Sequence, residues 1–511
     1  MTERIFKRKS IRLFLPFPGF IASLLAVGVV LTFTGCGDQN PGSAEENGVS
    51  GQAKPGYEES VSPEDGSENK SDNKNEDGNK SENKRENEDE YDSKSEDGNG
   101  EITESEEAVD EVVNDEPKNG ENKEAAPLVL GDERFDAYLP LLKDKRVAVF
   151  SNQSGLVGNK EKHVVDALIE KEVTVSLIFS PEHGFRGNAG AGELVNDETD
   201  EATGVEIVSL YGGSGDAFSD ENAERFDTLV VDIQDVGLRF YTYYITMYNL
   251  MDYCAEYGKE VVIFDRPNPN GFYVDGPILK DEFRSGVGAL PIPVVHGLTL
   301  GEMALMINGE GWLESGKDSC ILTVIPCENY KHSDLTGLAV NPSPNLKSMR
   351  AVYLYPSTCL FENTLVSVAR GTEHPFESFG SPYLEGVSGY DFEFVPVSME
   401  GAPGPQFEGQ TCYGKDLRDI PDEDIFENGI DLDYVIDAYN SIKAAAPDKS
   451  FFGKPNSDGH FWIDLLCGTD EVRLMIEDGK SSEEIKASWQ KDIEFFIEQR
   501  KPYLLYEDIY Q

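Results

Sequence analysis

The sequence is poor in the residues and motifs on which several common kinds of site depend. Its 511 residues include seven cysteines and six histidines, and no two cysteines form a C-x-x-C pair. This scarcity argues against a cysteine-based metal site and against a disulfide framework. The motifs G-x-G-x-x-G, G-x-x-x-x-G-K-[ST] and G-x-S-x-G are also missing, which argues against a bound dinucleotide, a phosphate loop and a serine-hydrolase elbow. We therefore predict activity without a metal or nucleotide cofactor.

Basic side chains are scarce as well. The chain has 44 lysines and arginines against 96 aspartates and glutamates, which gives a formal net charge of −52. Nucleic-acid binding depends on clustered positive charge, so the composition argues against a nucleic-acid partner. Residues 37–126 carry a net −20, from 29 acidic and 9 basic side chains, and residues 127–511 carry −36. The hydrophobically patterned part is therefore acidic in its own right.

Residues 1–36 have the layout of an export signal. Five basic side chains precede an apolar stretch that ends in "FTGC", at Cys36. This layout is that of a signal peptide, and its end resembles a bacterial lipobox, whose cysteine is lipidated after cleavage. An uncleaved anchor is the alternative, because the apolar run approaches the roughly 20 residues that span a bilayer. Either interpretation exports the rest of the chain, and we predict a lipoprotein anchored at the extracytoplasmic face of the cell membrane.

Residues 37–126 are a second, different segment. Stretches such as "SENKSDNKNEDGNKSENKRENEDEYDSKSEDGNG" contain almost no apolar residues. Such a chain cannot bury enough surface to offset its loss of conformational entropy, so we predict a disordered acidic linker. We interpret it as a solvated tether between the membrane and the folded part; a partner-binding acidic tail is the alternative.

The next part, residues 127–318, alternates short apolar runs with helical patterns. Buried strands are predicted at 146–152, 173–183, 228–235 and 260–271, and helices at 161–172, 239–258 and 299–314. In the last of these helices Thr299 and Glu302 have the spacing of a capping box. Strands that alternate with helices favour a parallel sheet covered on both faces, so we predict an α/β, Rossmann-like domain.

Residues 319–511 are less regular and favour a smaller mixed α/β domain. The apolar runs at 320–327, 351–356 and 391–399 predict strands, and helical spacing predicts helices at 431–447, 468–479 and 481–506.

Polar clusters follow three of the strands predicted for the N-terminal domain. "SPEHGFRG" (180–187) follows the second, "DIQDVGLRFY" (232–241) the third and "DRPNPNG" (265–271) the fourth. Ligands of such sheets bind at the carboxyl ends of the strands, so we expect these clusters at one functional rim. The alternative for Asp265 and Arg266 is purely structural, because an Asp after a strand often caps the next helix. A further cluster, at 341–383, contains Glu362, Arg370, Glu373 and His374.

Several long segments, in order, resemble the NamZ-type exo-β-N-acetylmuramidases. They are "FSPEHGFRGNAGAGE", "DIQDVGLRFYTY", "DRPNPNG", "LPIPVVHGLTLGEMA", "NPSPN", "YPSTCLFENTLVSVARGTEHPFE" and "GTDEVRLMIEDG". The resemblance runs from about residue 135 to 506. It implies a Rossmann-like domain joined to a smaller C-terminal domain, with the active site in the cleft between them. It further implies hydrolytic release of N-acetylmuramic acid (MurNAc) from the non-reducing end of peptidoglycan fragments, such as the MurNAc–GlcNAc disaccharide and muropeptides.

Hydrolysis of a glycosidic bond ordinarily needs two carboxyl groups, one of them protonated. Glu182 is our candidate for the general acid, because it follows an apolar strand and burial raises the pKa of a carboxyl group. His183 would orient Glu182 or share the proton transfer. The candidates for the second carboxyl group are Asp232, Asp235, Glu362 and Glu373.

The implied substrate also carries a lactyl carboxylate, which an acidic protein must receive with a cation. Arginines suit this role because they bind carboxylates through two parallel hydrogen bonds. A tyrosine at the rim could stack on a sugar face. The predicted substrate-binding residues are Arg186, Arg239, Tyr241, Asn270, His296, Asn345 and Arg370, although a structural role suits His296 better than a catalytic one.

Two alternatives to a glycosidase stay open at this point. A lipid-anchored protein that binds muropeptides without cleaving them would need the same two lobes, but it would not need an acid beside a histidine. An amidohydrolase or esterase is a weaker alternative, because the serine elbow and a clear set of metal ligands are missing.

Overall fold

The structure is a computed structural model that describes residues 126–181, 184–186, 197–210 and 216–510. The predicted export signal (1–36) and all but the last residue of the predicted linker (37–126) lie outside the described residues, as do Cys36, Glu182 and His183. Within the described ranges, no helix has both the length and the apolar character needed to cross a membrane.

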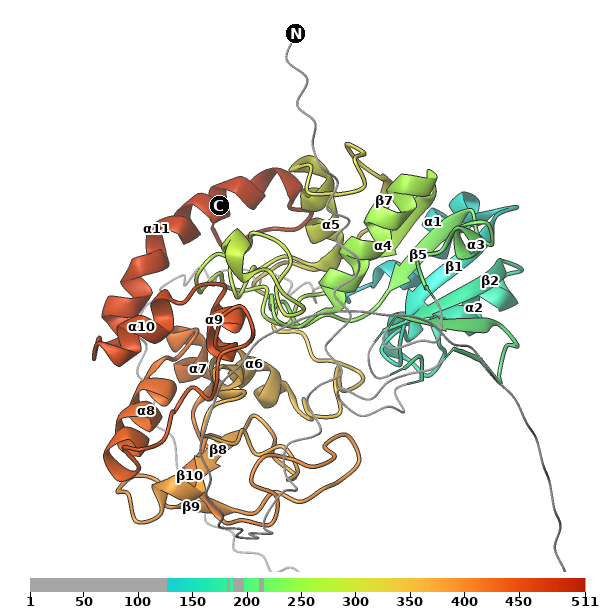
Figure 1. Cartoon of the computed structure of the whole chain (residues 1–511). Coiled ribbons are helices and arrows are strands. Elements are labelled where there is room, and N and C mark those ends of the chain that lie inside the picture. Colours follow the sequence, from blue (N-terminus) through green and yellow to red (C-terminus); the bar gives the residue numbers. More distant parts are fainter. Residues whose placement is uncertain (1–125, 182–183, 187–196, 211–215, 511) are drawn as a thin grey trace, which may run out of the picture. The chain divides into compact units, whose positions relative to one another are not determined.

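A seven-stranded sheet forms the centre of the N-terminal half (Figure 1). The strands lie in the order β3-β4-β2-β1-β5-β6-β7, and all described pairs are parallel except β3 with β4. After β1 the chain adds β2 and β4 on one side of it, and then adds β5, β6 and β7 on the other side. The boundary between β1 and β5 is therefore a topological switch point, and ligand crevices form at such points. The strands are β1 (Arg146–Ser151), β2 (Thr174–Ser180), β3 (Glu198–Thr199), β4 (Glu206–Ser209), β5 (Thr228–Asp232), β6 (Glu260–Phe264) and β7 (Ile321–Ile325).

The strands predicted for this half are confirmed as β1, β2, β5 and β6. The strand predicted at 320–327 is β7, which pairs with β6 from Glu260 opposite Ile321 to Phe264 opposite Ile325. This strand was predicted as part of the C-terminal domain, which begins at residue 319, but it forms the edge of the large N-terminal sheet. The predicted fold class, a Rossmann-like parallel sheet followed by a smaller α/β part, is confirmed.

Successive residues of the strands pack on opposite faces of the sheet, as the two-residue period of a strand requires. Val147 and Val149 belong to the core with α1 and α2, whereas Ala148 and Phe150 belong to the core with α4 and α5. The helices of this half are α1 (Phe135–Leu142), α2 (Val164–Glu170), α3 (Asp220–Ala223), α4 (Tyr243–Tyr257) and α5 (Leu300–Gly309). The sheet is thus buried between two helical layers, which confirms the predicted arrangement.

The helices predicted at 161–172 and 299–314 are confirmed as α2 and α5. The capping box of α5 is present, because the Thr299 hydroxyl accepts a bond from the Glu302 amide and the Glu302 carboxylate accepts one from the Thr299 amide. The helix predicted at 239–258 begins only at Tyr243. The residues before it stay in the loop that follows β5, where they border the rim.

The C-terminal half contains a small antiparallel sheet, in the order β8-β10-β9, and most of the remaining helices (Figure 1). The predicted helices are confirmed as α8, α10 and α11, and the strand predicted at 391–399 is reduced to β9. The elements are α6 (Met349–Thr358), β8 (Ser378–Ser381), β9 (Phe392–Phe394), β10 (Cys412–Asp416), α7 (Asp422–Asn428), α8 (Asp433–Ala445), α9 (Trp462–Cys467), α10 (Glu471–Glu477) and α11 (Ser482–Arg500).

The strand predicted at 351–356 is wrong, because these residues lie in helix α6. The Ser348 hydroxyl caps this helix by accepting a hydrogen bond from the Ala351 amide at 3.0 Å. Most of its residues are buried. A helix that is buried on most sides has no regular alternation of apolar and polar residues, so its sequence resembles that of a short buried strand.

Candidate active site

The predicted rim residue Asp232 ends β5 at the switch point and is completely buried. Its two carboxylate oxygens accept hydrogen bonds from Nε and Nη2 of Arg266, at 2.6 and 3.1 Å. Arg266 follows β6, so this pair joins the ends of two neighbouring strands. The contacts of Arg266 therefore agree with the structural role given above as the alternative for this residue. Asp232 has no exposed surface with which to contact a substrate.

Asp235, three residues further, is in a different environment. Its Oδ1 accepts a hydrogen bond from the Gly237 amide at 2.7 Å, but its buried Oδ2 has no partner among the described residues. Burial raises the pKa of Asp235 to about 7, against the opposing effect of the backbone amides that face it. A carboxyl group with this pKa exchanges its proton near neutral pH, which is a property of groups used in acid–base catalysis.

Tyr241 and Asn270 lie in the same rim region. The Tyr241 hydroxyl donates to the Pro342 carbonyl at 2.6 Å, which ties the loop after β5 to the "NPSPN" segment. Asn270 donates through Nδ2 to the Val236 carbonyl at 2.9 Å, and its buried Oδ1 has no partner in the described part of the chain. Asn345 is buried and donates to the Gly401 carbonyl at 2.8 Å. The three predicted residues thus hold rim loops together.

The loop after β2 is described only in part. Gly184 has φ +76°, a conformation that favours glycine, and its amide donates to the Pro181 carbonyl at 3.2 Å. Arg186 is bound by Asp200 through Nε and Nη2, at 3.1 and 2.9 Å, and its guanidinium stacks on Phe185. Phe185 is itself buried against the His163 ring. These contacts anchor the chain directly after Glu182 and His183.

Arg239 and His296 are completely enclosed. The guanidinium of Arg239 donates to the carbonyls of Pro277, Ile292 and Leu466, at 2.6 to 2.9 Å, and burial lowers its pKa to about 10. His296 accepts a hydrogen bond from the Leu298 amide through Nδ1, and burial lowers its pKa to about 3. It is therefore neutral, and neither side chain has exposed surface with which to contact a substrate.

Glu362 and Arg370 form a pair that reaches the surface. The Nε of Arg370 donates to Glu362 at 2.8 Å, and the guanidinium lies over the Phe376 ring. The side chains are 27% and 30% exposed, and neither Nη atom of Arg370 has a partner among the described residues. Of the three arginines predicted to receive a carboxylate, Arg370 is the one with an open edge. Glu373 is 79% exposed and lies 3.7 Å from Lys347.

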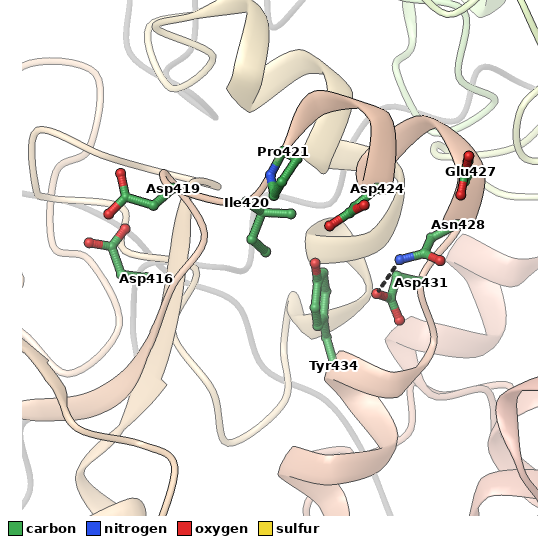
Figure 2. Close-up of a pocket in the computed structure, with 9 residues that line it drawn as sticks. All are labelled: Asp416, Asp419, Ile420, Pro421, Asp424, Glu427, Asn428, Asp431 and Tyr434. Atoms are coloured by element: carbon green, nitrogen blue, oxygen red, sulfur yellow. Dashed lines mark hydrogen bonds between the residues drawn. The ribbon is translucent and has the colours of Figure 1, made fainter.

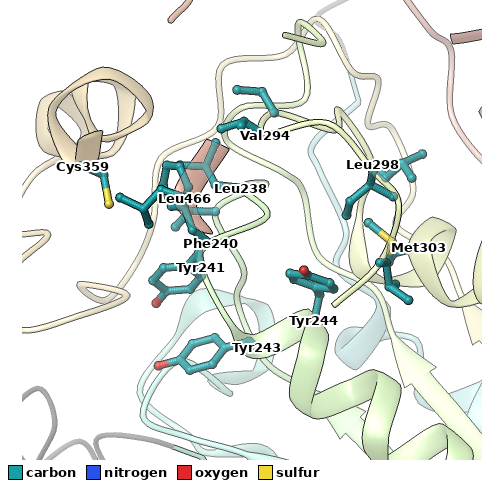
Figure 3. Close-up of a cluster of buried hydrophobic side chains, with 14 of the residues drawn as sticks. Leu238, Phe240, Tyr241, Tyr243, Tyr244, Val294, Leu298, Met303, Cys359 and Leu466 are labelled. Carbon is teal, nitrogen blue, oxygen red and sulfur yellow. The ribbon is translucent and has the colours of Figure 1, made fainter. Parts of the chain in front are cut away.

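Aromatic side chains connect this pair to the rim. Tyr355 packs edge-on against Phe240 and Phe376, at 5.4 and 4.8 Å between ring centres. Tyr241 packs edge-on against Tyr243, at 4.8 Å between ring centres (Figure 3). Asp235 and Tyr355 are both electrostatic neighbours of Tyr241, and Arg370 and Glu362 are neighbours of Tyr355. These aromatic side chains thus connect the two predicted clusters, and the sequence did not suggest Tyr355 as one of them.

A cavity of about 590 Å³ lies elsewhere and contains none of the predicted residues (Figure 2). It is an open hollow beside α7, where carboxylates face each other across Ile420 and Tyr434. Such a lining would repel a substrate that bears a carboxylate. No group of three or more potential metal ligands occurs in the described part of the chain. The acidic members of the lining are Asp416, Asp419, Asp424, Glu427 and Asp431.

The chain matches two family models and several known proteins. Residues 147–350 match the N-terminal model, and residues 353–506 the C-terminal model, of exo-β-N-acetylmuramidase NamZ. The peptidoglycan β-N-acetylmuramidase NamZ of Bacillus subtilis is 36% identical over 387 residues, which are 72% of this chain and 89% of that protein.

Two crystal structures of DUF1343 family proteins from Bacteroides fragilis have the same fold. One is 52% identical, with a TM-score of 0.67, and the match covers 75% of this chain and all of the other. The second is 26% identical, with a TM-score of 0.63, and the match covers 74% of this chain and 99% of the other.

Proposed function

The chain belongs to the NamZ family of exo-β-N-acetylmuramidases, and on this premise we propose that it releases MurNAc from the non-reducing end of peptidoglycan fragments during cell-wall turnover. It is a glycosidase. The observation that carries this conclusion is the match of nearly the whole folded part to both halves of the family. The reaction adds water across the glycosidic bond, so the leaving sugar oxygen must gain a proton and the anomeric carbon must gain a hydroxyl group.

Glu182 is the proposed proton donor to the leaving oxygen. The supporting observation is that the chain beside it is fixed at both ends, by the buried end of β2 and by the Phe185 and Arg186 contacts. General acid assistance contributes about 10²–10⁴-fold to a rate. Glu182→Gln should therefore lower kcat by at least about 100-fold with an unchanged melting temperature. Near-normal turnover of this variant would place the acid elsewhere.

Glu362 is the proposed second carboxyl group. Asp232 is buried under Arg266, Asp235 is also buried, and Glu373 is mostly exposed, whereas Glu362 is partly exposed and held beside Arg370. A lactyl carboxylate bound to the open edge of Arg370 would bring the sugar next to Glu362. Glu362→Gln should then lower kcat by about 100-fold or more, and Glu373→Gln, as the matched control, should leave kcat within about twofold.

The preferred substrates are proposed to be MurNAc–GlcNAc and short muropeptides that the chain meets outside the cytoplasm. The signal-like segment and lipobox support a lipid anchor at Cys36, with residues 37–126 as the tether. The activity is tested by incubating the purified chain with MurNAc–GlcNAc and separating the products. Release of free MurNAc supports the proposal, and binding of the intact disaccharide without cleavage would favour the binding-protein alternative.

A further inference from the structure

A short segment before α1, residues 127–133, runs along the ends of β6 and β7. Val129 and Glu328 exchange two backbone hydrogen bonds, at 3.0 and 2.8 Å, and the Gly131 amide donates to the Asp265 carbonyl. A Cβ atom at Gly131 would lie 2.4 Å from the Ile325 carbonyl oxygen. The segment therefore lies too close to the sheet for any side chain at this position. It follows directly on the predicted linker and precedes the first residue that the family model matches.

This segment delivers a buried carboxylate to the rim. Asp132 is completely buried, its Oδ2 accepts a hydrogen bond from Nη2 of Arg266 at 2.6 Å, and its Oδ1 accepts one from the Gly158 amide at 3.1 Å. The same guanidinium holds Asp232. Two buried carboxylates thus share one cation, and burial together with the Asp232 charge raises the pKa of Asp132 to about 7.

Arg266 is the hub of the rim. Besides the two carboxylates, it donates to the Leu156 carbonyl through Nη2 and to the Asn159 side-chain oxygen through Nη1, both at 3.2 Å. These residues belong to the loop after β1. One guanidinium therefore joins the loops after β1 and β6, the end of β5 and the segment 127–133, on both sides of the switch point.

We propose that Asp132 is a positioning residue for the hydrolytic site: it fixes Arg266, and through Arg266 it fixes the loop after β1 and the end of β5 relative to β6. Asp132 does not touch the substrate, because it has no exposed surface. The hub lies at the carboxyl edge of the sheet. Its partner Asp232 is three residues before Asp235, and the loop after β1, which Arg266 contacts, belongs to the strand next to β2, which leads to Glu182. The inference rests on the proposed function, because it concerns the geometry of that site.

The test uses Asp132→Asn in the full chain, which removes a charge from the hub and keeps the side-chain shape. Small displacements of reacting groups lower turnover more than binding, and a shift of about 1 Å can cost about 100-fold. We expect kcat on a chromogenic MurNAc glycoside to fall at least about tenfold, with KM within about threefold of its normal value.

The matched control is Asp464→Asn. Asp464 is also buried and also pairs with an arginine, since it accepts a hydrogen bond from Nε of Arg473 at 2.9 Å, but it lies in α9, away from the hub. A purely structural role for Asp132 would give both variants a similar loss of thermal stability and a similar kcat. The positioning role predicts a comparable loss of stability, but a fall in kcat for Asp132→Asn alone.

Asn159→Gly keeps the experiment decisive if Asp132→Asn does not fold. Asn159 is exposed and has φ +56°, so glycine fits its backbone and removes only the contact with Arg266. We expect a fall in kcat of about threefold with an unchanged KM. A normal kcat in Asn159→Gly, and in Asp132→Asn if it folds, would overturn the inference. An unmodified chain that cannot cleave the glycoside would instead overturn the proposed function.

Discussion

Replacement of Arg370 by alanine separates two arginines that the sequence presents as equal candidates for binding the lactyl carboxylate. Arg370 has an open guanidinium edge next to Glu362, whereas the guanidinium of Arg186 is taken up by Asp200 and stacked on Phe185. We therefore expect Arg370→Ala to weaken substrate binding and Arg186→Ala to weaken the fold.

The size of the effect follows from exposure. A hydrogen-bonded pair that involves charge contributes about 1.5–3 kcal/mol when it is buried and about 0.2–1 kcal/mol at the surface. The Arg370 side chain is 30% exposed, so we expect a loss of about 1–2 kcal/mol, or roughly 5- to 30-fold in KM. For Arg186→Ala, which uncovers the 5%-exposed Asp200 carboxylate, we expect a lower melting temperature and a KM within about twofold.

The assay compares two chromogenic glycosides, one of MurNAc and one of GlcNAc, which lacks the lactyl group. Arg370→Ala should raise KM for the MurNAc glycoside alone, so that the preference for MurNAc falls by the same factor. An unchanged KM for this variant would refute the reasoning. A larger rise in KM for Arg186→Ala, with an intact fold, would also refute it, because the Asp200 pair would then not occupy that arginine.

Three further predictions concern stability, cofactors and location. Burial alone would lower the pKa of His332, but Asp508 at 3.4 Å and Glu302 at 3.0 Å raise it to about 9. His332 should therefore stabilise the fold fully below pH about 6.5 and lose this contribution as pH rises through 9, which corresponds to a loss on the order of 3 kcal/mol. Urea unfolding at several pH values measures this loss, and a free energy of unfolding that falls equally between pH 6.5 and 9 in His332→Gln would contradict the prediction. Exhaustive chelation should leave kcat unchanged, and a loss that one added metal restores would show a cofactor that we did not predict. Cys36→Ser should shift the processed protein from the membrane to the soluble fraction, and equal membrane retention would exclude the lipid anchor.

The parts of the fold that the sequence predicts are those whose signal is local. Buried apolar runs identify β1, β2, β5 and β6, and the Thr299 and Glu302 spacing identifies the start of α5. Helix α6 was missed because it is buried on most sides, so its apolar residues show no period.

The candidate site is predictable in its location but not in its pairings. Strand ends place polar residues at the rim, but the partners of Arg239 and Arg266 come from far along the chain. Leu466 is 227 residues from Arg239, and Asp132 is 134 residues from Arg266. Whether an arginine is free or occupied depends on such contacts, so the sequence offered three equal candidates where the structure favours Arg370.

The most direct test of the central claim is the cleavage of MurNAc–GlcNAc by the purified full-length chain, followed by separation of the sugars. We predict free MurNAc and GlcNAc in equal amounts, no cleavage of a GlcNAc–GlcNAc disaccharide, and no cleavage of MurNAc–GlcNAc by Glu182→Gln. A chain that leaves MurNAc–GlcNAc intact, or that cleaves both disaccharides equally well, would contradict the assignment of an exo-acting muramidase.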